Sequence, residues 1–61
     1  MPIINVTLVE GRPDAHVEAF IKRVAEVAAE ELHAPLETVR VMVNEVPKTR
    51  FAVGNVLKSE Q

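Results

Sequence analysis

Two stretches of this 61-residue chain carry apolar residues with the short period of β-strands. Residues 3–9 are rich in β-branched side chains and place Ile4, Val6 and Leu8 on one face, so they predict a strand. The opposite face of this stretch is also largely apolar. Residues 39–46 predict a second strand, because valines occupy alternate positions in its first half.

Between these strands, apolar residues recur at steps of three and four and predict one helix of about 18 residues. The recurring residues are Val17, Phe20, Ile21, Val24, Ala28 and Leu32. Pro13 or Asp14 is suited to open this helix, and Pro35 ends it because the residue before a proline avoids helical geometry. After the second strand, residues 47–50 predict a turn and residues 51–55 a short hairpin or edge strand before a polar tail.

A strand, a helix and a strand with about 30 residues between strand starts predict a βαβ unit with parallel strands and a right-handed crossover. We therefore expect one α/β (α+β) domain over residues 1–61, with a two-stranded sheet and one long helix. One helix covers only one face of that sheet, yet residues 3–9 are apolar on both faces. The sequence therefore predicts that the second face packs against another copy of the chain.

The composition narrows the function. Seven basic and nine acidic residues give a net charge of −2, and two phenylalanines are the only aromatic residues, which disfavours nucleic acid as a partner. No cysteine is present and His16 and His33 lie far apart, so we expect surface histidines and no metal site. No apolar run approaches the roughly 18 residues of a membrane helix, and a cytoplasmic protein is expected.

Three residues carry candidate chemistry. Removal of Met1 would turn Pro2 into a free secondary amine and a titratable base, although a Met-Pro start is also common without any such role. Arg12, just after the first strand, is by default a solvated loop residue. Arg40 lies inside an apolar strand, so its charge needs a partner. Either a carboxylate of Glu37 or Glu45 or an anionic ligand would satisfy it, and the sequence leaves both open.

A set of short motifs spread over nearly the whole chain resembles the 4-oxalocrotonate tautomerase family, also called 2-hydroxymuconate tautomerases. The motifs are Pro2, Glu10-Gly11-Arg12, Ala34-Pro35, Val39-Arg40-Val41, and Phe51 followed by Val53-Gly54. The resemblance implies a βαβ protomer with a C-terminal hairpin, assembled into a homohexamer as a trimer of dimers, although the family also includes assemblies of two different subunits. It implies no metal or organic cofactor.

The resemblance also implies a role for each matching residue. Pro2 would be the general base, and Arg12 would hold the distal carboxylate of the substrate. Arg40 would bind the carboxylate and oxygen beside the reacting carbon. The apolar wall would come from Phe51, Val9 and Val53. Departures from the family pattern at Pro47, Arg50, Ala52 and Asn55 concern the geometry of the hairpin and the choice of substrate.

These expectations define a cofactor-independent isomerase. It would move a proton in an unsaturated 2-hydroxy or 2-keto dicarboxylic acid, of the kind formed in aromatic hydrocarbon catabolism. Guanidinium groups near the Pro2 nitrogen would lower the pKa of the amine toward the working pH of a general base. A hydratase or decarboxylase acting on a related acid is the nearest enzymatic alternative, and a non-catalytic assembly subunit is the alternative from another class.

Overall fold

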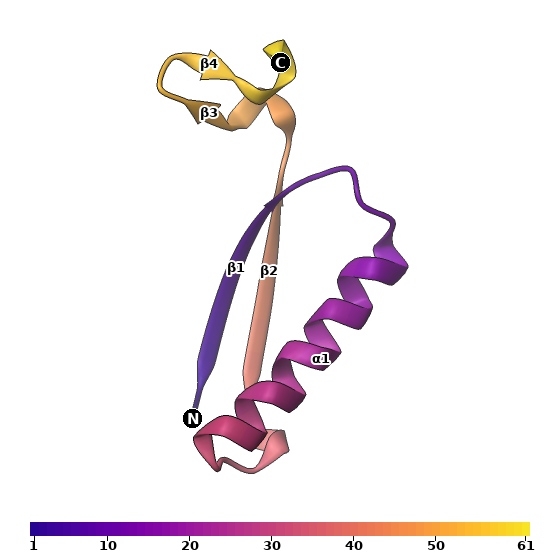
Figure 1. Cartoon of the computed structure of the whole chain (residues 1–61), viewed down its shortest axis with the longest axis vertical. Coiled ribbons are helices and arrows are strands. Elements are labelled where there is room, and N and C mark those ends of the chain that lie inside the picture. Colours follow the sequence, from indigo (N-terminus) through magenta and orange to yellow (C-terminus); the bar gives the residue numbers. More distant parts are fainter.

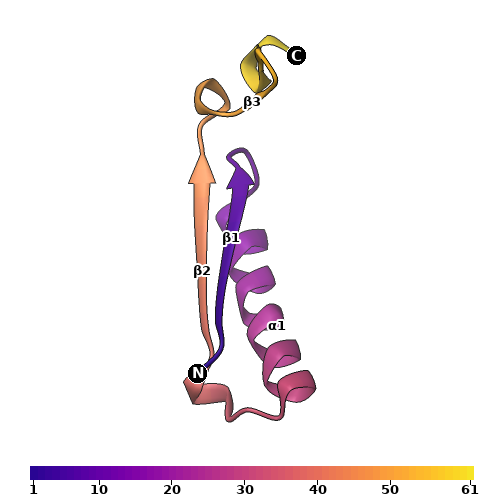
Figure 2. The same cartoon turned by 90° about the vertical axis from the view of Figure 1, so that its left-hand side faces the viewer.

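The computed structural model describes all 61 residues and contains the expected βαβ unit. Strand β1 spans Ile3–Val9, helix α1 spans Asp14–Leu32, and strand β2 spans Arg40–Val46. The two strands are parallel and pair residue by residue from Ile3 opposite Arg40 to Val9 opposite Val46. Figure 1 shows α1 running alongside the strands on one side of the sheet, and Figure 2 shows the same arrangement after a quarter turn.

The residues that flank α1 (Asp14–Leu32) explain where the helix begins and ends. Pro13 occupies the capping position with φ −58° and ψ 142°, where its missing N–H removes no helical hydrogen bond. At the other end, His33 adopts the left-handed conformation with φ 53° and donates its main-chain N–H to the Ala29 carbonyl. Pro35 then prevents a further turn. The boundaries expected from the sequence are confirmed.

The single chain has almost no core. Only Val17 and Ala28, both on α1, are buried among the 61 residues. Along β1 the alternating residues Ile4, Val6 and Leu8 are half-buried, whereas Ile3 on the opposite face is 56% exposed. Since so little apolar surface leaves water within one chain, and small domains depend on what they bury, this protomer needs further contacts to be stable.

The C-terminal segment forms a separate antiparallel hairpin. Strand β3 spans Ala52–Val53 and pairs with β4, Val56–Leu57, across a turn in which Gly54 has φ 62°. The sequence prediction stopped the hairpin at residue 55, so it was wrong to assign Val56–Leu57 to the polar tail. Short 3₁₀ turns, Lys48–Arg50 and Lys58–Glu60, flank the hairpin, which lies beyond the end of β2 and away from α1 in Figure 1.

No helix is both long enough and apolar enough to cross a membrane.

Candidate active site

The structure brings Pro2 and Arg40 together at the start of the parallel sheet. The main-chain N–H of Arg40 donates to the Pro2 carbonyl at 2.9 Å, which extends the ladder one step before β1 begins. Pro2 is half-buried and Arg40 is exposed. Because proline has no N–H, the Pro2 nitrogen donates no hydrogen bond to the pairing of the strands.

The Arg40 guanidinium is held by main-chain carbonyls. Its Nη1 donates to the Glu37 carbonyl at 2.9 Å and, more weakly, to the Val39 carbonyl at 3.4 Å. The sequence left open a carboxylate partner or an anionic ligand, and the structure joins Arg40 to Glu37 through the backbone. A carbonyl orients a guanidinium without neutralising it, so the positive charge remains available to an anion.

The opposite end of the sheet carries a second group of candidate residues. Arg12 Nη1 donates to the Val9 carbonyl at 3.2 Å, so this arginine lies against the last residue of β1. Gly11, just before it, has φ 131°, which a residue with a side chain rarely adopts. The glycine therefore allows the chain to turn sharply and bring the Arg12 side chain back to the strand end.

Phe51 and Val53 lie in the hairpin that follows β2, beyond the same end of the sheet as Arg12 (Figure 1). The Phe51 carbonyl accepts a hydrogen bond from the Lys58 N–H at 2.8 Å, which ties the hairpin to the C-terminal turn. Val53 is 65% exposed. These apolar side chains are thus presented to the surroundings by the hairpin.

The six candidate residues accordingly fall into two groups toward opposite ends of the parallel sheet. We call Pro2 and Arg40 the amine group, and we call Val9, Arg12, Phe51 and Val53 the wall group. Seven strand residues at about 3.3 Å each separate the groups by roughly 20 Å. One chain therefore does not bring all six residues into one site.

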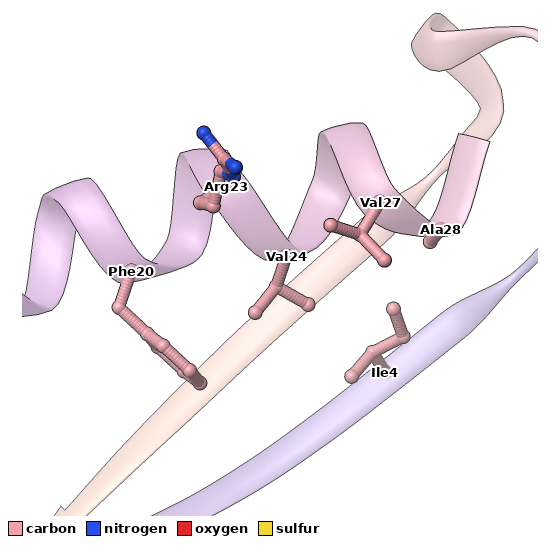
Figure 3. A pocket seen from close by; sticks show the side chains of 6 residues that line it. All are labelled: Ile4, Phe20, Arg23, Val24, Val27 and Ala28. Atoms are coloured by element: carbon pink, nitrogen blue, oxygen red, sulfur yellow. The ribbon is translucent and has the colours of Figure 1, made fainter. Parts of the chain in front are cut away.

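A groove between α1 and β1 is a feature that the sequence did not reveal. It has a volume of about 350 Å³, and Figure 3 shows the side chains that line it. They are Ile4, Phe20, Arg23, Val24, Val27 and Ala28. Phe20 and Val27 are 41% and 47% exposed although both are apolar, and Arg23 is the only charged residue of the groove. The apolar stripe on α1 is thus wider than β1 and β2 cover.

Neither histidine belongs to the amine group or to the wall group. His16 and His33 are exposed, as expected from the sequence. No cluster of three or more His, Cys, Asp or Glu side chains has a geometry that could hold a metal ion.

Comparison with known proteins adds an independent finding. Residues 2–61 match a family model described as tautomerase enzyme. The chain is 46% identical over 54 residues to a 2-hydroxymuconate tautomerase of Pseudomonas sp. strain CF600, covering 88% of this chain and 86% of that protein. The structure is similar to a crystal structure of a 4-oxalocrotonate tautomerase homologue, with a TM-score of 0.92 and 39% identity over 100% of this chain and 97% of the other.

A further solved relative bears on assembly. A heterohexameric 4-oxalocrotonate tautomerase from Chloroflexus aurantiacus is 30% identical, with a TM-score of 0.91 over 98% of this chain and 97% of its own. Both structural likenesses extend over nearly the whole of each chain, so they include the C-terminal hairpin as well as the βαβ unit.

Proposed function

Because this chain belongs to the tautomerase family and is therefore a keto–enol isomerase, we propose that it moves a proton within an unsaturated 2-hydroxy or 2-keto dicarboxylic acid. The conversion of 2-hydroxymuconate to 2-oxo-3-hexenedioate is the type reaction, and it proceeds without a metal or organic cofactor. The observation that carries the proposal is the 2.9 Å bond from the Arg40 N–H to the Pro2 carbonyl, which places the main chain of Arg40 next to Pro2 at the start of the sheet.

Pro2 is the general base once Met1 has been removed. Met1 is 78% exposed and lies outside β1, so its loss disturbs no strand pairing. The freed nitrogen is a secondary amine, and the reference pKa of a chain-terminal amine is about 8. A guanidinium beside this nitrogen, a role that we assign to Arg40, favours the neutral amine and lowers its pKa, so that the amine can act as a base near neutral pH.

The proton transfer involves only the substrate and Pro2, and no proton or electron is gained or lost overall. The neutral Pro2 nitrogen takes the proton of the enol hydroxyl, and the electron pair of the broken O–H bond forms the carbonyl. The electrons of the carbon–carbon double bonds shift along the conjugated chain, and a carbon atom takes the proton back from the Pro2 ammonium. The enzyme ends in the state in which it began.

The arginines hold the two ends of the substrate. Arg40 binds the carboxylate and the oxygen beside the reacting carbon, where it stabilises the negative charge of the dienolate. Arg12 binds the distal carboxylate and draws electron density toward it. Phe51, Val9 and Val53 form an apolar wall, which keeps water away and strengthens both charge interactions.

The complete site is shared between chains. The amine group and the wall group lie roughly 20 Å apart in one protomer, but an antiparallel neighbour paired along β1 would bring the amine group of one chain to the wall group of the other. The exposed apolar groove beside β1 supports such a neighbour, because a second α1 would cover Phe20 and Val27. We take the assembly to be a homohexamer built as a trimer of dimers, while the Chloroflexus relative shows that two kinds of subunit also occur in this family.

The proposal is tested by incubating chains that begin at Pro2 with 2-hydroxymuconate and following the enol absorbance. Rapid loss of the enol with formation of the conjugated ketone supports the proposed isomerisation. Proton NMR of the product separates this outcome from addition of water or loss of carbon dioxide, which would identify a hydratase or a decarboxylase. Absence of any turnover, in protein shown by mass to lack Met1, would contradict the proposal.

A further inference from the structure

The short turn between α1 and β2 is closed by a threonine hydroxyl. Pro35 precedes the 3₁₀ turn Leu36–Thr38, and its carbonyl accepts two hydrogen bonds from Thr38. One comes from the Thr38 Oγ1 at 2.7 Å and the other from the Thr38 N–H at 3.0 Å. The Val39 N–H adds a bond to the Leu36 carbonyl at 3.0 Å. The turn is therefore fixed from both its side-chain and its main-chain groups.

This turn presents the carbonyl that holds Arg40. The Glu37 carbonyl, inside the turn, accepts the 2.9 Å bond from Arg40 Nη1, while the Val39 carbonyl accepts the weaker one. A guanidinium has five N–H donors in a rigid plane, so bonds at Nη1 set the direction of the Nη2 and Nε donors as well. The orientation of the whole charged group thus depends on where the turn places the Glu37 carbonyl.

The main chain of Arg40 is fixed independently by the ladder, through its N–H to the Pro2 carbonyl. This bond does not restrict the side chain, which could still rotate about its own bonds. Ordering a side chain as long as arginine costs rotamer entropy, so some other contact must hold it. Thr38 is half-buried and lies two residues before Arg40 in the sequence. The guanidinium of Arg40 is bonded to the Glu37 carbonyl and not to a carboxylate. The turn is consequently the element that orders the guanidinium.

We propose that Thr38 is a positioning residue for Arg40: its hydroxyl closes the Pro35–Thr38 turn, which aims the Glu37 carbonyl at the Arg40 guanidinium. This inference rests on the proposed function, since it takes Arg40 as the group that binds the substrate carboxylate. With the hydroxyl removed, the turn loosens, and substrate binding must order an arginine that was ordered beforehand in the native protein.

Replacement of Thr38 by valine removes the hydroxyl and keeps the shape of the side chain. In chains beginning at Pro2, Thr38→Val should raise KM for the dicarboxylate about three- to tenfold, the cost typical of ordering one long side chain, while kcat changes less than KM. Thr38→Ser retains the hydroxyl and should restore KM to near the native value. Thr49→Val, the same change in the 3₁₀ turn of the hairpin, should leave KM unchanged.

Coupling to Arg40 distinguishes positioning from general destabilisation. In an Arg40→Gln background, Thr38→Val should have no further effect on KM, because the group that it positions is gone. An equal rise in KM with and without Arg40, or a failure of Thr38→Ser to restore it, would overturn the inference. A fall in kcat and thermal stability with KM unchanged would do the same.

An NMR measurement tests the inference without turnover. The Nε–H group of Arg40 in the native assembly should have an order parameter near that of rigid backbone, about 0.85, whereas a freely rotating guanidinium would fall below about 0.6. Thr38→Val should lower the value and Thr38→Ser should not. A low value in the native protein overturns the positioning role of Thr38. Lack of turnover with an ordered Arg40 would instead count against the proposed function alone.

Discussion

Pro2 and Arg40 are coupled by the main chain as well as by their proposed chemistry. The ladder bond between them holds the proline by its carbonyl, so the position of the ring depends on β2 and not on Met1. The nitrogen lies on the side of the ring that the sheet does not use. A change at this nitrogen should therefore alter catalysis and leave the fold intact.

We expect that one extra residue before Pro2 will abolish most of the activity. The added peptide bond converts the amine into an amide without basicity, and loss of a general base costs about 10²-fold or more. Pro2→Ala should retain more activity than the extended chain, since a primary amine still accepts a proton. Rates with an enol diacid measure both effects, and light scattering serves as the control for assembly. Equal rates for the native and extended chains would exclude Pro2 as the base.

The pH dependence should report the same amine. Because only the neutral amine accepts a proton, kcat/KM should rise with pH through one ionisation that lies below the reference amine value of about 8. If Arg40 lowers the pKa of the amine as proposed, Arg40→Gln should move that ionisation to higher pH while KM increases. A pH profile that does not move in Arg40→Gln would show that the cation has no influence on the base.

For individual residues, the sequence identified the candidates but not the groups that they contact. Pro2 stood out because its position is chemically unusual, and Arg40 because a cation interrupts an apolar strand. The acceptor of the Arg40 guanidinium could not be predicted, because it is a main-chain carbonyl and every residue has one. The resemblance to a known family supplied the roles, which composition and spacing alone left open.

At the scale of elements, α1 has buried apolar residues and also exposed apolar residues. Val17 and Ala28 are its buried residues, and Ala28 also lines the groove beside β1 together with the exposed Phe20 and Val27. Figure 3 shows these groove side chains projecting from α1 on the side of Ile4. The free edge of β1 lies alongside, with unpaired main-chain groups that a second strand could use.

A charge placed in this groove should separate the subunits. Val27→Asp would bury a carboxylate in an apolar contact without a designed partner, so we expect smaller species in sedimentation velocity and a loss of activity. Ala19→Asp adds the same charge at an exposed position of the same helix and should leave assembly unchanged. An intact assembly in Val27→Asp would show that the groove is not a subunit contact.

The boundaries of the long elements were predictable, and those of the short ones were not. Pro13 and Pro35 bracket α1 because proline constrains the backbone directly. Strand β4 has only two residues, Val56–Leu57, which is too short for any periodicity to register. Its pairing with β3 depends on the turn at Gly54 and on the C-terminal turn that follows.

At the scale of the molecule, the protomer is an open shape of 42 × 24 × 13 Å with its proposed chemistry at two ends. Nothing in one chain covers the groove, the free edge of β1 or the exposed side of the hairpin. A neighbouring chain would compensate for both the small core and the divided site. It would bury the exposed apolar surface, and it would bring its wall group to the amine group of the first chain.

The protein should accordingly be an obligate oligomer. Light scattering at micromolar concentration should give the mass of six chains of 6.7 kDa, about 40 kDa. A well-folded monomer of 6.7 kDa under these conditions would remove the physical basis of a shared site.

Mixed assemblies test the sharing itself. Pro2→Ala and Arg12→Ala should each lower activity in separate assemblies, and mixing the two after subunit exchange should restore part of it. Recovery is expected because some sites then combine a native Pro2 from one chain with a native Arg12 from its neighbour. Native mass spectrometry confirms exchange, and no recovery in exchanged assemblies would indicate that both residues act within one chain.

The residue-by-residue pairing of β1 with β2 also limits how this protein can change in length during evolution. One residue inserted into β1 would exchange the two faces of the strand after that point, and two residues would keep the faces but lengthen the strand by about 7 Å. Either insertion would have to be matched in β2, because the strands are paired along their full length. Insertions and deletions should therefore be rarer in β1 and β2 than at residue 13 or at residues 33–34, which lie outside the strands, both groups of candidate residues and the Pro35–Thr38 turn.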